Sequence, residues 1–446
     1  MKYGVLILSL ILLTITAAGQ SQSAPALPAA PISGSVQDQP AVDSYESVNQ
    51  PLSGVETQDI GIPSSTRNTL IPNFTFSGGW DSNAPRLASS GSDSASGSAA
   101  FSGGLTLNRD YGKGNTTSLS YMGGEQLYTI DSELNSQFHR LFLEQTLVAG
   151  RWSFLVSDGL SYQKDAYANA PPMLFPGLYF GPGGTLFRPG VTPGESIIGQ
   201  NTPRINNTSA GQVTYGFSRA TALTASFSYG LLQYFDTNAY LSNRQMAAGG
   251  GLDHKFGRNT IGVNYGYSKF SYDDIPVKFD THTVQLMYSH VLTGRWSFEV
   301  GGGPTIIVSD YAFLNSTKVY GSGQVALHYH MPRSDWSVHY GRSVTNGSGV
   351  LPGAISDEVG LTASRRLSKS MTANLSGGYA RNSGAFTDSR FNTFNVGAGI
   401  SQEIGRYLTM SVGYTGQHQT GSSYSGLSRN SVLVSLGWSF RPIRLQ

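Results

Sequence analysis

From Ile71 onward, apolar and small polar residues alternate with a period of two along most of the chain. This spacing places the two classes on opposite faces of extended strands. The last strand shows it best, with Val432, Val434, Leu436, Trp438 and Phe440 on one face and Ser431, Ser435, Gly437 and Ser439 on the other. The pattern recurs near residues 223–231, 261–268, 336–340, 371–379 and 408–415, and is ambiguous near 138–148. The sequence therefore predicts an all-β protein.

The connections predict how the strands are joined. Short turns are expected at residues 110–115, 149–150, 219–220, 257–259, 293–294, 332–334, 367–370 and 405–406. Longer polar links are expected at 81–97, 124–136, 163–204, 236–242, 272–280, 309–318, 344–355, 381–388 and 416–427. With an opening strand at 70–80 and a closing strand at 429–441, this alternation predicts 18 strands, with 16 as the next count. The arrangement is a single transmembrane antiparallel up-and-down barrel with both ends on the short-turn side.

The composition of the polar face distinguishes a membrane barrel from a soluble β-sandwich. It consists of Ser, Thr, Gly, Asn and Gln, whereas a water-facing sheet carries many Lys and Glu residues. The apolar face ends in aromatic residues at recurring places, including Trp152 and Trp296 in identical Arg-Trp-Ser-Phe segments, and Trp336 and Trp438. Rings with one polar edge favour the membrane interface. We interpret these residues as an aromatic girdle.

In these features the chain resembles outer-membrane β-barrel proteins of diderm bacteria, across residues 70–440. The resemblance implies a porin-like barrel in contact with outer-membrane lipid and assembled by the barrel-assembly machinery. Members of the class commonly end in an aromatic residue that this machinery reads, whereas here Phe440 is followed by Arg441 to Gln446. The Gly-Gly-Trp-Asp-Ser-Asn segment at 78–83 is similar to the end of the first strand in uncharacterised barrels of this kind.

The N-terminus predicts export. Lys2 precedes an apolar run at 5–15 and the small residues Ala17-Ala18-Gly19, which is typical of a signal peptide at 1–19. A single membrane anchor is the alternative. Residues 20–68 are rich in Ala, Pro, Ser and Gln, which predicts a disordered periplasmic extension that could engage a periplasmic partner. The barrel would then span 69–442, followed by a short tail at 443–446.

Composition narrows the chemistry. The 446 residues include no Cys, and 13% are charged with a formal net charge of +2. Disulfides and thiolate metal sites are therefore excluded. The small net charge also lacks the excess of basic residues that nucleic-acid binding requires. No Gly-x-Ser-x-Gly, His-Glu-x-x-His or Walker motif occurs, so we predict no enzyme and no cofactor, with a membrane-barrel hydrolase as a remote alternative.

Several residues are phased toward the barrel interior and are predicted to line a pore: Ser226, Ser228, Asn264, Glu299, Gln324, His328, His330, His339, Glu358, Asn374, Ser376, Thr409 and Ser411. A symmetric turn at 332–334 would set His328 opposite His339, with His330 on the same face. These imidazoles could bind a metal or titrate, or simply form hydrogen bonds in the lumen. The two glutamates could set ion preference, or pair with an inward arginine.

The link at 163–204 differs from the others in its length and its aromatic and proline content. Links of this size are usually functional or disordered. We expect it to narrow the pore through Phe175, Tyr179, Phe180, Phe187 and Arg188. A lid on the rim or a contact in a homo-oligomer is the alternative. The long links also carry many acidic residues, which could hold divalent ions beside lipopolysaccharide phosphates or serve as solvated loops.

The function predicted from this architecture is a channel that passes small hydrophilic solutes or a saccharide. The alternative is a non-transport surface or structural barrel, such as an adhesin or a component of polysaccharide secretion.

Overall fold

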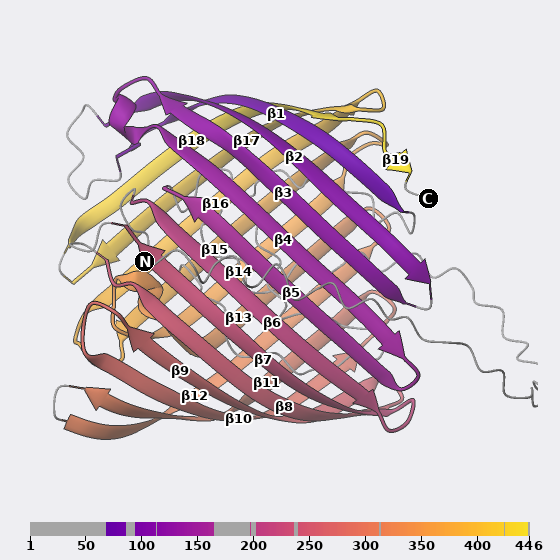
Figure 1. Cartoon of the computed structure of the whole chain (residues 1–446), viewed down its shortest axis with the longest axis vertical. Helices are drawn as coiled ribbons and strands as arrows, with labels where there is room; N and C mark the ends of the chain where they lie inside the picture. The colour runs from indigo at the N-terminus through magenta and orange to yellow at the C-terminus, as the bar shows by residue number, and fades with distance from the viewer. Residues whose placement is uncertain are drawn as a thin grey trace, which may run out of the picture. The chain divides into compact units, whose positions relative to one another are not determined.

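The computed structural model describes residues 68–85, 94–112, 114–164, 197, 202–235, 240–311, 314–422 and 424–444. The predicted signal peptide and nearly all of the predicted extension lie outside these residues. The described chain contains 18 long β-strands, one two-residue strand and two 3-10 turns, Ser132–Leu134 and Gly347–Gly349 (Figure 1). Neither of these short turns has the length or apolar character to cross a membrane.

The strands close into one antiparallel barrel. Each strand pairs with the next along the chain, and β18 pairs with β1, so 18 strands form the wall rather than 16. Their bounds are β1 (Thr69–Asp81), β2 (Ser96–Gly112), β3 (Asn115–Tyr128), β4 (Ser136–Ala149), β5 (Trp152–Gln163), β6 (Arg204–Gly216), β7 (Thr221–Tyr234), β8 (Asn243–Phe256), β9 (Asn259–Tyr272), β10 (Val277–Val291), β11 (Trp296–Tyr311), β12 (Leu314–Met331), β13 (Ser334–Thr345), β14 (Ala354–Arg366), β15 (Met371–Gly384), β16 (Arg390–Ile404), β17 (Leu408–Gly421) and β18 (Tyr424–Ser439).

The seam between β1 and β18 is closed by backbone pairing and by a buried ion pair. Phe74 lies opposite Trp438 and Asp81 opposite Ser431. The Arg429 guanidinium donates from Nε to Asp81 Oδ2 at 2.8 Å, and both side chains are less than a tenth exposed. Beyond β18, the short strand β19 (Ile443–Arg444) pairs with Thr69 and Leu70, so the predicted tail begins as an extension of the sheet. Figure 1 shows the C-terminus beside this strand.

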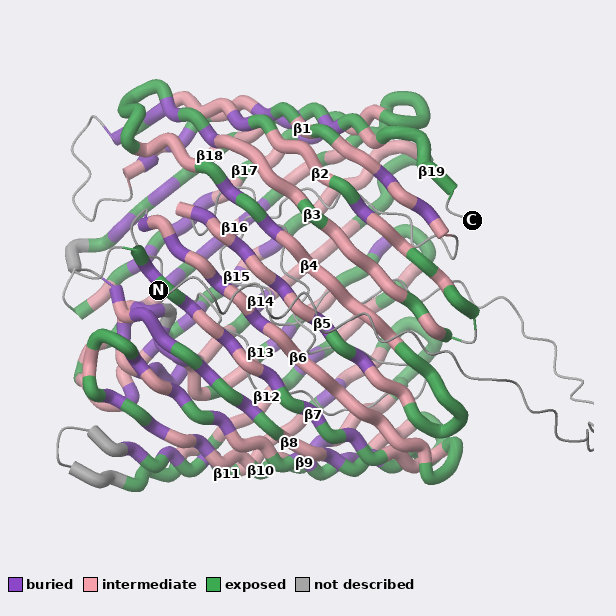
Figure 2. The backbone as a smooth tube through the Cα atoms, in the orientation of Figure 1, coloured by how far each residue is buried: buried purple, intermediate pink, exposed green. Residues whose placement is uncertain are grey.

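The apolar face of the strands lies outside, as predicted. The large exposed apolar residues include Phe227, Val263, Val338, Leu375, Val412 and Val434, each alternating with inward polar residues. Trp152, Trp296, Trp336 and Trp438 are 39–50% exposed, and each lies at the strand end beside the short turns or the C-terminus. Figure 2 shows buried and exposed residues following one another along the strands. A closed barrel with an outer apolar belt and an aromatic girdle is an outer-membrane β-barrel.

All eight predicted short turns are confirmed, and we call their side of the barrel the turn end. Gly150, Gly257 and Gly405 have φ of 63°, 61° and 75°, the left-handed conformation that tight hairpin turns require.

The other side of the barrel is the link end, and three of its predicted links are largely strand. β11 and β12 continue through most of 309–318, β17 and β18 continue through most of 416–427, and β10 begins at Val277. Strand pairing satisfies backbone polar groups in water as well as in lipid, so a polar hairpin can extend past the belt. The polar composition of these segments therefore did not mark the strand ends.

Candidate functional site

The predicted pore-lining residues all lie on the inward face. Ser226, Ser228, Asn264, Glu299, His339, Ser376 and Ser411 are buried, and Gln324, His328, Glu358, Asn374 and Thr409 are partly buried. His330 is exposed near the turn end of β12. Their neighbours in sequence, such as Phe227, Val325 and Val412, are exposed on the outside. The alternation thus assigned the faces correctly, while pore lining itself stays a prediction.

The predicted histidine arrangement is wrong. Met331 pairs with Ser334, so the turn holds two residues, and His328 lies opposite Ser337 while His339 lies opposite Ala326. Pairing of His328 with His339 would need four residues in the turn, so the observed two-residue turn moves the partner of His328 by two positions. His330 instead contacts the carboxylate of Asp335. Within the described part of the chain, no group of three metal-ligating side chains is placed to hold an ion.

The two inward glutamates accept hydrogen bonds from neutral side chains of the wall. The Gln324 amide donates to Glu299 Oε1 at 2.7 Å, and the Ser356 hydroxyl donates to Glu358 Oε1 at 2.9 Å. The described contact of Glu358 is therefore a hydroxyl rather than an arginine.

The opposite wall is basic at the link end. The Arg140 guanidinium donates to Gln163 Oε1 at 2.8 Å, and the Arg204 guanidinium donates to the Tyr234 hydroxyl at 3.3 Å. Both arginines are buried on the inward face of β4 and β6, whereas Glu299 and Glu358 lie on β11 and β14.

The link between β13 and β14, residues 346–353, folds onto the inside of the barrel; we call it the mouth loop. The Asn346 amide donates to Asn243 Oδ1 at 3.1 Å, and the Tyr272 hydroxyl donates to the Asn346 carbonyl at 2.9 Å. The Leu241 N–H donates to the Gly349 carbonyl at 2.8 Å. Asn243 and Tyr272 are inward residues of β8 and β9, so these bonds hold the loop inside the link end.

Glycine allows the mouth loop to make this turn. Gly347, Gly349 and Gly353 have φ of 66°, 72° and 86°, a conformation that side-chain-bearing residues rarely adopt. A Cβ on Gly349 would also lie 2.5 Å from the Tyr234 ring, and one on Gly353 would lie 2.9 Å from the Phe279 ring. Gly349 and Gly353 therefore serve both the backbone conformation and the close approach of aromatic side chains.

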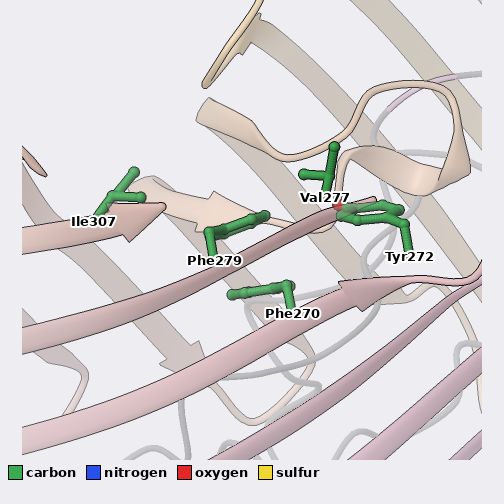
Figure 3. Packing of buried hydrophobic residues seen from close by; sticks show 5 residues of the cluster. All are labelled: Phe270, Tyr272, Val277, Phe279 and Ile307. Carbon is green, nitrogen blue, oxygen red and sulfur yellow. The ribbon is translucent and has the colours of Figure 1, made fainter. Parts of the chain in front are cut away.

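An apolar core supports the mouth loop from the wall. Phe270, Tyr272, Val277, Phe279 and Ile307, the mouth cluster, are inward residues of β9 to β11 and are almost fully buried (Figure 3). The rings of Phe270 and Phe279 stack with centroids 4.4 Å apart. Phe386 of the β15–β16 link meets the Phe279 ring edge-on at 5.2 Å. Burial of this apolar surface stabilises the folded-in arrangement.

The backbone of the β15–β16 link joins the mouth loop. The Ala385 N–H donates to the Gly353 carbonyl at 3.1 Å, and the Lys318 ammonium donates to the Ala385 carbonyl at 3.0 Å. Two links and the adjacent wall strands β8 to β12 therefore form one packed unit at the link end.

Residue 197 belongs to the link that we predicted to narrow the pore. Ile197 is buried in a cluster with Leu351 of the mouth loop and with Ala354 and Phe391, which are inward residues of β14 and β16. At this residue the link between β5 and β6 therefore lies inside the barrel. Phe175, Tyr179, Phe180, Phe187 and Arg188 lie outside the described residues, and their part in a constriction stays a prediction.

Sequence reasoning missed the mouth loop, although the chain carries a signal for it. In β10, Val277 and Phe279 are apolar and inward while Lys278 is outward, whereas further along Thr283 is inward and Val284 outward. In β9, Phe270 and Tyr272 are likewise inward, opposite in phase to Ile261 and Val263. The apolar residues change faces at the edge of the lipid belt. Such a reversal indicates that something apolar covers the inner wall there.

Comparisons with known proteins find only distant structural likenesses and assign neither a family nor a function. No protein-family model and no curated protein matches the chain. The crystal structure of Pseudomonas aeruginosa OpdK with vanillate has 12% identity and a TM-score of 0.44, covering 83% of this chain and 99% of that one. Pseudomonas aeruginosa OccK2 in complex with glucuronate has 12% identity and a TM-score of 0.43, with coverage of 84% and 98%. The ferric-catecholate import receptor Fiu from E. coli K12 has 8% identity and a TM-score of 0.42, with coverage of 84% and 81%. At these values the likeness carries no conclusion about a solute.

Proposed function

We propose that this protein is an outer-membrane channel for small hydrophilic solutes, narrowed at its link end by the mouth loop. The observation that carries the proposal is the inward wall itself. Over the height of the lipid belt, this wall is built mostly from Ser, Thr, Asn, Gln and Gly. At 18 strands the wall side chains need not fill the barrel, so a water-filled passage is physically available.

The folded-in mouth is what we expect of a selective passage. A wide barrel lined by small polar residues would pass any solute below a size limit, whereas a packed loop sets a narrower section. The mouth loop rests on hydrogen bonds to Asn243, Tyr272 and Leu241, so its position is fixed by several contacts rather than one.

Single-channel recording tests the proposal. The full chain, refolded and inserted in a planar bilayer, is expected to give discrete conductance steps in KCl. Heat-modifiable migration on a gel would verify that the barrel is folded. A folded protein that gives no steps would contradict the channel function.

A second function is favoured by the packing at the mouth. The mouth cluster and the loops above it could seal the barrel, in which case the protein would serve as a structural or surface component rather than a channel. Conductance measured before and after removal of the mouth loop distinguishes the two functions. A sealed barrel would conduct only after the mouth loop is removed, whereas a channel conducts before removal as well. Hydrolase assays on the same refolded protein test the enzyme alternative.

A further inference from the structure

The outer face of β5 carries a carboxylate within the lipid belt. Asp158 lies on the outward face of this strand, between the exposed Val156 and the outward Leu160. Its cross-strand neighbours are the outward residues Leu143 of β4 and Ser209 of β6. Lipid-facing positions of a barrel are normally apolar, and a charged group in the membrane is costly and usually functional. Because Asp158 faces outward, a role in lining the pore does not account for it.

Two groups of aromatic rings on the same strands bound the belt around Asp158. At the turn end, the outward Trp152 contacts Tyr215 with ring centroids 4.6 Å apart. At the link end, the outward Tyr162 contacts His139 with ring centroids 6.3 Å apart. Along β5, Asp158 lies six residues from Trp152 and four from Tyr162, about 20 Å and 13 Å of strand. The carboxylate is therefore inside the belt rather than at either interface.

The wall supplies Asp158 with neutral hydrogen-bond donors only. The Ser209 hydroxyl and the Asn207 amide both donate to Oδ1, the amide at 3.3 Å. Among the residues that the structure describes, no Lys, Arg or His forms an ion pair with Asp158. Acyl chains cannot donate hydrogen bonds, so lipid offers this carboxylate nothing in place of water.

Asp158 belongs to a polar patch on the outside of the wall. Asn207 and Ser209 face outward on β6, where they alternate with buried residues, and Gln145 faces outward on β4. Gly211 follows Ser209 on the same face, and an added Cβ there would have no atom within 4 Å. We call Gln145, Asp158, Asn207 and Ser209 the outer patch. Its strands, β4 to β6, lie side by side in Figure 1.

Outward positions on other strands differ from the outer patch. The outward carboxylate of Asp357 on β14 forms an ion pair with Arg342 at 3.3 Å and accepts a hydrogen bond from the Tyr340 hydroxyl at 3.0 Å. Asp158 has neither kind of partner among the described residues. On β16 to β18 the outward residues of the belt are apolar and exposed, as at Ile400, Val412 and Val434.

The inner face behind the outer patch is correspondingly apolar. In β5, Leu155 is inward and buried while Asp158 is outward, and in β4 Phe142 is inward while Gln145 is outward. This inversion accounts for the ambiguous alternation near residues 138–148. The apolar-outward rule holds where lipid covers a strand, so its failure here indicates that something other than lipid covers these strands.

From these observations we infer that the outer patch is an interface, and that its occupant is a second copy of this chain lying alongside in the membrane. The patch complements itself, because the Asp158 carboxylate accepts hydrogen bonds while the amides of Gln145 and Asn207 donate them. About a two-fold axis normal to the membrane, both copies present the same patch at the same depth, so acceptors of one face donors of the other. Polar groups and small residues join membrane segments in this way, and Gly211 and Ser209 allow the two walls to approach.

The test counts copies in the membrane with a fluorescent label placed away from the patch. The chain contains no Cys, so Lys369→Cys in the exposed turn between β14 and β15 gives one labelling site. The patch variant is Asp158→Leu/Asn207→Leu. The control variant, Arg342→Leu/Asp357→Leu, replaces an outward polar pair on another wall. Each labelled full-length protein is refolded in lipid vesicles over a series of lipid-to-protein ratios, and copies are counted by photobleaching steps and by energy transfer.

We expect the protein with an intact patch to show two bleaching steps and energy transfer that persists on dilution in lipid. The patch variant should dissociate about tenfold more readily, because each copy loses its hydrogen bonds to the other. Its melting temperature should not fall, and its conductance per barrel should equal that of the wild type, because leucine suits a lipid-facing position. The control variant should remain dimeric.

The inference fails if the protein with an intact patch stays monomeric at every dilution, which would leave lipid or a different protein as the cover of the patch. A patch variant that dimerises as well as the wild type would place the contact elsewhere. Equal dissociation of the patch and control variants would show that the outer patch has no special role. The counts do not depend on conduction, so the proposed channel function is tested separately.

Discussion

The inner face of the barrel differs between the mouth and the lipid belt, and strand β10 contains both regions. At its link end, Val277 and Phe279 point inward and are each 1% exposed, while Lys278 is outward. Further along, Thr283 points inward, and Val284 and Leu286 lie outside at 46% and 61% exposure. The apolar side chains of β10 therefore face inward at the link end and outward in the lipid belt.

The difference reflects which solvent meets the outer face. Where lipid surrounds the strand, apolar side chains belong outside and the interior can be polar. Where water surrounds it, the same sheet obeys the rule of soluble proteins, and apolar side chains go to the covered face. The mouth is in this sense a small soluble-type core built on the end of a membrane barrel.

The largest expected effect comes from removing the mouth loop. Thr345 and Ala354 are cross-strand partners, so deleting residues 347–352 leaves Asn346-Gly353 as a two-residue Asn-Gly hairpin, a favoured turn. We expect single-channel conductance to rise by about two- to threefold, because the narrowest section loses its filling.

A matched deletion at the link end provides the control for this experiment. Residues 130–134 of the β3–β4 link are mostly exposed, so their removal should leave conductance unchanged. Equal conductance of the mouth-loop deletion and the wild type would show that the mouth loop does not limit the passage.

The sequence predicts the belt better than the mouth, for a physical reason. Alternation and tight turns are local, so Val432 to Phe440 and the turn at Gly150 could be assigned without knowing the fold. The face of Phe279 depends on where the lipid ends and on the mouth loop far along the chain, and neither is encoded near residue 279.

Register is similarly sensitive. The histidine prediction failed because the turn after Met331 holds only two residues, and the length of that turn determines the partner of His328. Local patterns thus determine which face a residue takes, while pairing partners depend on turn length, which the pattern does not specify.

The next effect concerns the buried ion pair at the link end of the seam. Replacing Arg429 by Met leaves the Asp81 carboxylate buried without its guanidinium, which we expect to cost about 3–5 kcal/mol of unfolding free energy. Denaturant unfolding in lipid vesicles measures this loss of unfolding free energy. Arg342→Met is the control, since Arg342 and Asp357 are 41% and 27% exposed, and its cost should stay below about 1 kcal/mol. Similar losses for both variants would contradict a special role for the seam pair.

A smaller effect is expected from the mouth cluster. Phe279→Ala removes a ring that stacks on Phe270 and touches Phe386, and should cost about 3 kcal/mol through lost burial and a residual cavity. The outward Phe394, 52% exposed in the belt, provides the comparison. Because a soluble-type core does not depend on lipid, the unfolding free energy lost in Phe279→Ala should be the same in thin and thick bilayers. The free energy lost in Phe394→Ala should vary with bilayer thickness. A dependence on bilayer thickness at Phe279 would place that residue in the belt.

The smallest effect separates backbone strain from packing within the mouth. Gly353 and Gly405 have φ of 86° and 75°, so an alanine at either position pays a similar conformational cost of about 1–2 kcal/mol. Around Gly405, at the turn end, no atom lies within 4 Å of an added Cβ, whereas at Gly353 the Phe279 ring lies 2.9 Å from an added Cβ.

Gly353→Ala should therefore destabilise the barrel more than Gly405→Ala. This additional destabilisation should shrink when Gly353→Ala is combined with Phe279→Ala, because the obstructing ring is gone. Unfolding of the four variants in one lipid measures this coupling. If the two alanine costs are equal and additive with Phe279→Ala, the mouth is held by its backbone alone, and the contrast between a packed mouth and an open turn end loses its energetic basis.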